Sequence, residues 1–97
     1  MRFEILLAPE ALEDQKKLDP DVWAGVRKAI DLHLRHEPMK VSRSRIKRLR
    51  GLRKPQFRLR VGDVRVFYDV VGDEVHILAI VPKSQAVAWL EELGEPE

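Results

Sequence analysis

The stretch FRLRVGDVRVFY, residues 57–68, alternates apolar and polar side chains on both sides of a Gly-Asp pair. Alternation with a period of two is typical of a half-buried β-strand. A Gly-Asp pair between two such runs predicts a two-residue hairpin turn with glycine in its first position. Such a turn fixes the pairing of the two strands, so we expect Val61 to face Val64 and Arg60 to face Arg65.

A second Gly-Asp pair follows at residues 72–73 and extends the hairpin into a three-stranded antiparallel meander. Carried through this turn, the register sets Tyr68 opposite Ile77, Val66 opposite Ala79, and His76 opposite Asp69 as a structural cross-strand pair. The three predicted strands cover residues 56–61, 64–71 and 74–81.

The predicted register divides the side chains of the meander between two faces. The core face collects Phe57, Leu59, Val61, Val64, Val66 and Tyr68. The opposite face collects Arg58, Arg60, Arg65, Phe67, Asp69, His76, Leu78 and Ile80. Apolar side chains on this second face need cover. The C-terminal helix or a partner protein could supply it, and we predict that Phe67, Leu78 and Ile80 contact a partner.

The segments before and after the meander predict three helices and one further strand. Residues 2–7 alternate weakly, as a strand does, and Pro9 and the pair Asp19-Pro20 are signals of helix starts. The second helix carries an apolar stripe made of Trp23, Val26, Ile30 and Leu34. Residues 39–55 predict a loop in which 46–49 are the most strand-like, and 83–93 predict a terminal helix.

Together these elements predict one α+β domain over residues 1–97. It would contain an N-terminal strand, an antiparallel two-helix hairpin, the meander and a C-terminal helix, with four strands in the sheet. The chain has no cysteine, and no stretch approaches the roughly 20 apolar residues of a membrane-spanning helix. Its start also lacks the features of a secretory signal, so we expect a cytoplasmic protein without a membrane partner.

Charge is strongly segregated along the chain. Residues 40–65 hold eleven basic side chains and one acid, a net of +10, whereas the other 71 residues hold 7 basic and 15 acidic side chains, a net of −8. Such a segment is typical of a surface that binds an anion, most often a nucleic acid backbone. In the loop, the residues predicted to contact the phosphates of a nucleic acid are Arg43, Arg45, Lys47, Arg48, Arg50, Arg53 and Lys54.

Two arginines directly opposite one another in a sheet repel. Their placement suggests that Arg58, Arg60 and Arg65 converge on an external anion, and that Arg60→Ala or Arg65→Ala would leave the fold intact. The alternative is that acids elsewhere in the chain neutralise them. The tail offers Glu91, Glu92, Glu95 and Glu97 for this role.

The motif Leu-Arg-Gly at residues 49–51, together with residues 57–68 and the order of the elements, resembles the RelE/ParE toxin superfamily over nearly the whole chain. The resemblance implies a toxin of a type II toxin-antitoxin system that forms a hetero-oligomer with its antitoxin. Members similar to RelE cleave mRNA in the ribosome, and members similar to ParE inhibit DNA gyrase. The resemblance favours the ribosome-dependent mRNA endonuclease; the alternatives are a gyrase inhibitor without nuclease chemistry or a member that only binds its antitoxin.

The resemblance also implies which residues act. Arg58, Arg60 and Arg65 match the basic positions of the two strands, and Lys83 matches a basic residue after the last strand. The C-terminal tyrosine of RelE-like enzymes has no counterpart, since Trp89 cannot transfer a proton. The sequence contains no glycine-rich phosphate loop and no cluster of carboxylates or histidines, so we expect neither a metal nor a nucleotide cofactor.

Overall fold

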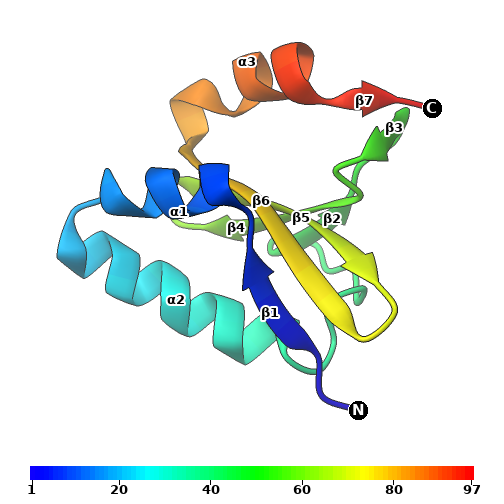
Figure 1. Cartoon of the computed structure of the whole chain (residues 1–97), viewed down its shortest axis with the longest axis horizontal. Coiled ribbons are helices and arrows are strands. Elements are labelled where there is room, and N and C mark those ends of the chain that lie inside the picture. Colours follow the sequence, from blue (N-terminus) through cyan, green and yellow to red (C-terminus); the bar gives the residue numbers. More distant parts are fainter.

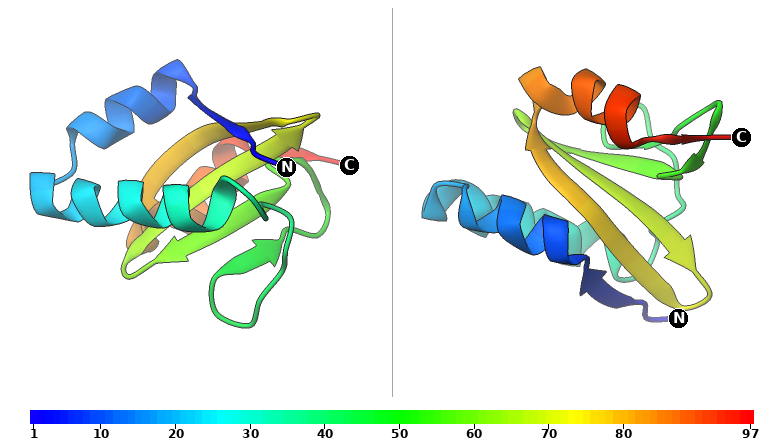
Figure 2. Two further views of the ribbon diagram at one scale, coloured as in Figure 1. Left: turned by 90° about the horizontal axis from the view of Figure 1, so that it is seen from below. Right: turned by 45° about the horizontal axis from the view of Figure 1, so that its top comes forward.

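The computed structural model describes residues 1–97 as an α+β domain in three layers. A sheet lies in the middle, the helices α1 (Pro9–Lys16) and α2 (Pro20–Leu34) cover one face, and α3 (Lys83–Leu93) crosses the other (Figures 1 and 2). The first two helices run side by side in opposite directions, as the predicted hairpin requires (Figure 1). The predicted fold class is confirmed. No helix has both the length and the apolar character that crossing a membrane demands.

The main sheet has five strands in the order β1-β6-β5-β4-β2, one strand more than predicted. The additional strand is β2, which lies in the basic loop and pairs with the outer edge of β4. A separate two-stranded sheet joins β3 to the C-terminal β7. The strands are β1 (Glu4–Leu7), β2 (Ile46–Arg48), β3 (Leu52–Lys54), β4 (Phe57–Val61), β5 (Val64–Val71), β6 (Glu74–Pro82) and β7 (Glu95–Pro96).

Both hairpin turns have the predicted form. Gly62 and Gly72 have φ values of +56° and +60°, and only glycines in this chain have a positive φ. This matches a turn that needs a left-handed residue only at its first position. The register from β4 to β5 is also as predicted, with Arg60 opposite Arg65.

The register from β5 to β6 departs from the prediction at the residues of β5 that precede Tyr68. Tyr68 pairs with Ile77 as expected, but Val66 pairs with Ile80 rather than with Ala79, because β6 contains one extra residue at this point. A bulge of this kind turns the following side chains to the other face. Ile80 therefore lies in the main core, so its predicted place on the partner-binding face is wrong.

Residues of β6 contribute to two apolar cores, one on each face of the sheet. The larger core lies under α1 and α2 and contains Leu34, Leu59, Tyr68 and Ile77 among its buried residues. The smaller one lies under α3 and consists of three buried residues, with partly buried side chains of α3 packed on it. Its buried members are Phe67, Ala79 and Val81.

Local signals explain where the first two helices begin. Pro9 occupies the first turn of α1, where an absent N–H leaves no hydrogen bond unmade. Pro20 does the same in α2, and the Asp19 carboxylate accepts a hydrogen bond from the N–H of Asp21 at 2.9 Å. Asp14 of α1 then accepts from the N–H of Ile80 at 3.0 Å. The pairing of β1 with β6 ends at Ile77, so this bond gives the Ile80 N–H an acceptor that β1 does not provide.

Candidate nucleic-acid interface

Strands β4 and β5 bring three arginines together on the face of the sheet that α3 crosses. Arg60 and Arg65 are direct cross-strand partners, and Arg58 lies two residues from Arg60 on the same face. Strand β2 adds Lys47, which is the cross-strand partner of Arg58. The sequence analysis placed Lys47 in a loop, and only the pairing of β2 with β4 shows that it joins the arginines.

Arg65 is held firmly at this site. Its side chain is buried, with 7% of the residue exposed, and its Nη1 donates to the carbonyl oxygens of Gly62 at 2.8 Å and Val64 at 3.1 Å. These bonds orient the guanidinium from the hairpin turn itself. Arg65 therefore supports the turn as well as adding charge, and its removal is expected to cost stability.

Arg58 is half-buried, and its Nε is a buried donor without a hydrogen-bond partner. Burial lowers the pKa of its guanidinium, and the nearby charges of Arg65 and Arg60 lower it further. None of the three arginines forms an ion pair within the chain. Tail neutralisation is not observed either, because Glu95 pairs with Arg53 instead. The arginines thus form a positively charged cluster that lacks an anion.

Lys83 lies at the border of this cluster. It begins α3, its backbone N–H donates to the carbonyl oxygen of Asp63 at 2.7 Å, and its side chain is exposed. The start of α3 is thereby tied to the hairpin turn next to Arg65. We call Lys47, Arg58, Arg60, Arg65 and Lys83 together the basic face.

The remaining basic residues of the loop separate into two groups. Arg43, Arg45 and Arg50 are exposed. The others make contacts within the protein: Arg48 lies over the Phe57 ring at 5.2 Å and donates to the carbonyl oxygen of Gln56 at 3.1 Å, while Arg53 and Lys54 lie on β3 beside the C-terminal strand.

The apolar residues predicted to contact a partner have three different surroundings. Phe67 is fully buried beneath α3, where its ring stacks on Trp89 with 5.0 Å between centroids. Ile80 lies in the main core, as described above. Leu78 is half-buried and lines a groove of about 290 Å³ with Ala8, Pro55, Trp89 and Leu93, bordered by Glu10, Lys54 and Glu95. Of the three residues, Leu78 is the one that lines this groove.

Apart from Lys83, the candidate groups for proton transfer lie away from the arginines or are engaged elsewhere. His76 faces Asp69 in the register as predicted, but its Nε2 is bonded to Glu74 at 2.9 Å. Asp69 lies four residues along β5 from Arg65, a distance of about 13 Å in a strand. Tyr68, the only tyrosine, is buried in the main core and donates to the carbonyl oxygen of Pro38 at 2.6 Å. No three histidine or carboxylate side chains come together as metal ligands do.

The comparisons with known proteins agree with this fold. Residues 5–87 match the family model described as the ParE toxin of the type II toxin-antitoxin system parDE. The chain is similar to the toxin-antitoxin complex RelBE2 from Mycobacterium tuberculosis, with 26% identity, a TM-score of 0.69, and coverage of 84% of this chain and 99% of that one. No curated protein matches the sequence.

Two further solved structures share the fold at lower identity. The RelE–RelB complex from Pyrococcus horikoshii is 22% identical with a TM-score of 0.70, over 88% of this chain and 99% of that one. A mutant of the E. coli toxin RelE in the free state is 17% identical with a TM-score of 0.69, over 96% and 99%. With a family model matched over most of its length and this architecture, the chain belongs to the ParE toxin family of the RelE/ParE superfamily.

Proposed function

We propose that this toxin is a ribosome-dependent mRNA endonuclease that inhibits translation in the cytoplasm until a cognate antitoxin binds it. The observation that carries the proposal is the Arg58 guanidinium, whose buried Nε has no partner and whose neighbours are two further arginines without an acid. A buried donor without a partner is costly for a folded protein. A phosphodiester group at this place would supply the absent acceptor and the absent negative charge.

The basic face suits the electrostatic part of RNA cleavage. In this reaction a ribose 2′-hydroxyl releases its proton to solvent and its oxygen attacks the adjacent phosphorus. The bond from phosphorus to the 5′-oxygen breaks, the 5′-oxygen takes up a proton, and a 2′,3′-cyclic phosphate remains. Negative charge accumulates on the phosphoryl oxygens in the transition state, where oriented guanidinium donors stabilise it. The bonds from Arg65 to two carbonyl oxygens orient its guanidinium before any substrate binds.

The chain offers little for proton transfer beside those arginines. Lys83 is the exposed amine at the border of the basic face, and it is the group we assign to deliver a proton toward the departing 5′-oxygen. Positioning of the substrate by the ribosome would supply a large part of the rate acceleration, because orientation alone can lower a barrier by several kcal/mol. Dependence on the ribosome is therefore part of the proposal.

We infer that the antitoxin covers the groove lined by Leu78, Trp89 and Leu93. An amphipathic helix would bury its apolar residues there. Acidic residues elsewhere on the antitoxin would neutralise the arginines of the basic face, which have no acidic partner in the chain. Phe67 and Ile80 are excluded from direct contact while α3 and the main core are in place.

Inhibition of DNA gyrase without nuclease chemistry is the second candidate. Two observations favour it: the matching family model is that of ParE toxins, and the only tyrosine lies in the core, away from the arginines. A gyrase inhibitor needs a binding surface but no group that transfers a proton.

The test is primer extension on a defined mRNA in a cell-free translation reaction with purified protein. Arg60→Ala is the active-site variant, because Arg60 is exposed and its side chain makes no hydrogen bond within the chain. Arg27→Ala on α2 is the matched control, since it also removes one exposed arginine. Cuts within the reading frame that require ribosomes and disappear only in Arg60→Ala support the nuclease. Intact mRNA together with inhibited supercoiling by purified gyrase supports the second candidate instead.

A further inference from the structure

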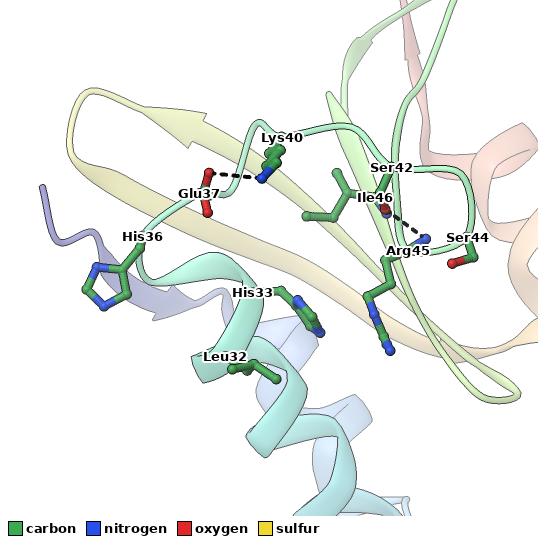
Figure 3. A pocket seen from close by; sticks show the side chains of 9 residues that line it. All are labelled: Leu32, His33, His36, Glu37, Lys40, Ser42, Ser44, Arg45 and Ile46. Atoms are coloured by element: carbon green, nitrogen blue, oxygen red, sulfur yellow. Dashed lines mark hydrogen bonds and ion pairs between the residues drawn. The ribbon is translucent and has the colours of Figure 1, made fainter.

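A second recess in the molecule lies between the end of α2 and the start of the basic loop, away from the face that α3 crosses. It has a volume of about 330 Å³ (Figure 3). Figure 3 shows the side chain of Arg45, from the loop, extending down beside the ring of His33, which comes from the helix. The full lining consists of Leu32, His33, His36, Glu37, Lys40, Ser42, Ser44, Arg45 and Ile46.

The charge of this recess is positive and partly uncompensated. Glu37 is paired with Lys40, with 3.5 Å between the carboxylate oxygen and the ammonium, so these two charges offset each other. Arg45 has no carboxylate partner in the chain. A guanidinium without a carboxylate partner in the chain can bind a phosphate or carboxylate through bidentate, charge-assisted hydrogen bonds.

The positive charge of the recess also affects the pKa of His33. Its pKa is lowered by partial burial and by the positive charge of Arg45. Lys40, Glu37 and His36 are the other titratable groups around it. An anion held between His33 and Arg45 would offset the repulsion and favour the protonated imidazole, which then donates from both ring nitrogens.

The loop that carries Arg45 is built to a defined shape. The Ser42 hydroxyl accepts hydrogen bonds from the N–H groups of Arg45 at 3.1 Å and Ile46 at 3.2 Å, and the Ser42 N–H donates to the Ile46 carbonyl at 3.0 Å. The Arg45 carbonyl accepts from the N–H of Arg60 at 2.8 Å. The backbone of the recess is therefore joined directly to the strand that carries the basic face.

We propose that this recess binds a phosphate group of the RNA backbone, as a second anchor on the other side of the edge strand β2 from the basic face. The inference rests on the proposed function, because it takes RNA as the ligand. The position of the recess favours RNA over a small phosphorylated molecule. Arg45 in the recess and Lys47 of the basic face are both exposed and lie two residues apart at the outermost strand of the sheet, so one RNA backbone could contact both.

The first experiment measures the affinity of a fluorescently labelled single-stranded RNA by anisotropy at several salt concentrations. Arg45→Gln is expected to weaken binding about tenfold, the loss of a charged hydrogen-bonded contact. It should also reduce the slope of log K against log salt by about 0.7, the value for one phosphate of a single strand. Arg27→Gln on α2 is the matched control, because it removes the same charge from an exposed position outside the recess and outside the basic loop, and it should weaken binding less than about threefold.

The second experiment follows the imidazole resonances by NMR during pH titration. RNA is expected to raise the apparent pKa of His33, whose imidazole lines the recess beside Arg45. The Arg45→Gln spectrum also checks folding, because the loop is held by backbone groups and Ser42 rather than by the arginine side chain.

The outcomes separate the two proposals. If Arg45→Gln and Arg27→Gln bind RNA equally well while the wild-type protein still cleaves mRNA on the ribosome, the recess is not an RNA anchor and the nuclease proposal stands. If inorganic phosphate shifts His33 but RNA does not, the site takes free phosphate and the RNA assignment is wrong. If the wild-type protein neither binds RNA nor cleaves mRNA, the proposed function fails and the anchor fails with it.

Discussion

At the scale of single residues, the charge of Arg58 favours binding of an anion but lowers the stability of the free protein. Its buried Nε lacks a partner, and two like charges lie nearby. Arg58→Met should therefore raise the free energy of unfolding by about 0.5–1 kcal/mol, because it removes both costs and keeps most of the apolar stem. The midpoint of urea unfolding measures this, with Arg27→Met as the control. A lower midpoint for Arg58→Met would contradict the uncompensated cluster.

The two opposed arginines should behave differently when each is removed. Arg65→Ala should cost about 1–2 kcal/mol of stability, since Nη1 no longer satisfies the carbonyls of Gly62 and Val64. Arg60→Ala, at an exposed position, should change stability by less than about 0.5 kcal/mol. Both should lose RNA cleavage. Thermal unfolding of the two variants side by side distinguishes the roles, and equal melting temperatures would show that Arg65 does not support the turn.

At the scale of elements, α1 stabilises β6 at a position that β1 does not reach. The Asp14 carboxylate accepts from the Ile80 N–H. Asp14→Ala should cost about 1 kcal/mol, because that donor is left without a partner. Glu13→Ala is the control on the same helix, since its ion pair with Lys16 is exposed and contributes little. Urea unfolding measures both, and an equal effect of the two substitutions would show that the bond to β6 adds no stability.

Helix α3 should open more readily than the sheet beneath it. It has no fully buried residue of its own, no side-chain cap at its start, and packs on a core of three residues. Its amide hydrogens, from Ala86 to Leu93, should therefore exchange through local opening, far faster than those of Val66 and Tyr68. Native-state hydrogen exchange by NMR tests this. Equal protection of α3 and β5 would mean that the helix opens only when the whole domain unfolds.

At the scale of the whole molecule, the segregated charge should make stability depend on salt. Residues 40–65 carry a net charge of +10, and the arginines of the basic face have no acidic partners. Screening of this repulsion predicts that the free energy of unfolding rises by roughly 1 kcal/mol between 0.05 and 0.5 M NaCl. The Arg58→Met variant should show a smaller rise. Urea unfolding at each salt concentration checks this, and a decrease with salt would show that attractive ion pairs dominate.

Much of the architecture could be predicted because its signals are local. The Gly-Asp pairs set the hairpin turns, and with them the complete register from β4 to β5. Pro9 and the Asp19-Pro20 pair locate the first two helix starts for similar reasons. Because the arginine pair at positions 60 and 65 follows from that register, the centre of the candidate site was within reach of sequence reasoning.

The features that escaped prediction depend on contacts between distant segments. The bulge in β6 falls within the apolar run of residues 77–81, where no alternation marks which side chain faces the core. The burial of Arg65 depends on where the turn carbonyls point, and the approach of His33 to Arg45 depends on how the loop folds back on α2. Residue types alone contain no signal for such contacts.

The extra residue in β6 also determines where the chain can change in length. Removing one residue between Ile77 and Ile80 would restore simple alternation and reverse the orientation of the remaining side chains of the strand. Val81 would then leave the core under α3, and the start of α3 at Lys83 would lose its alignment with Asp63. Among related sequences, insertions and deletions should therefore occur in the loops, while the number of residues between Ile77 and Lys83 stays constant.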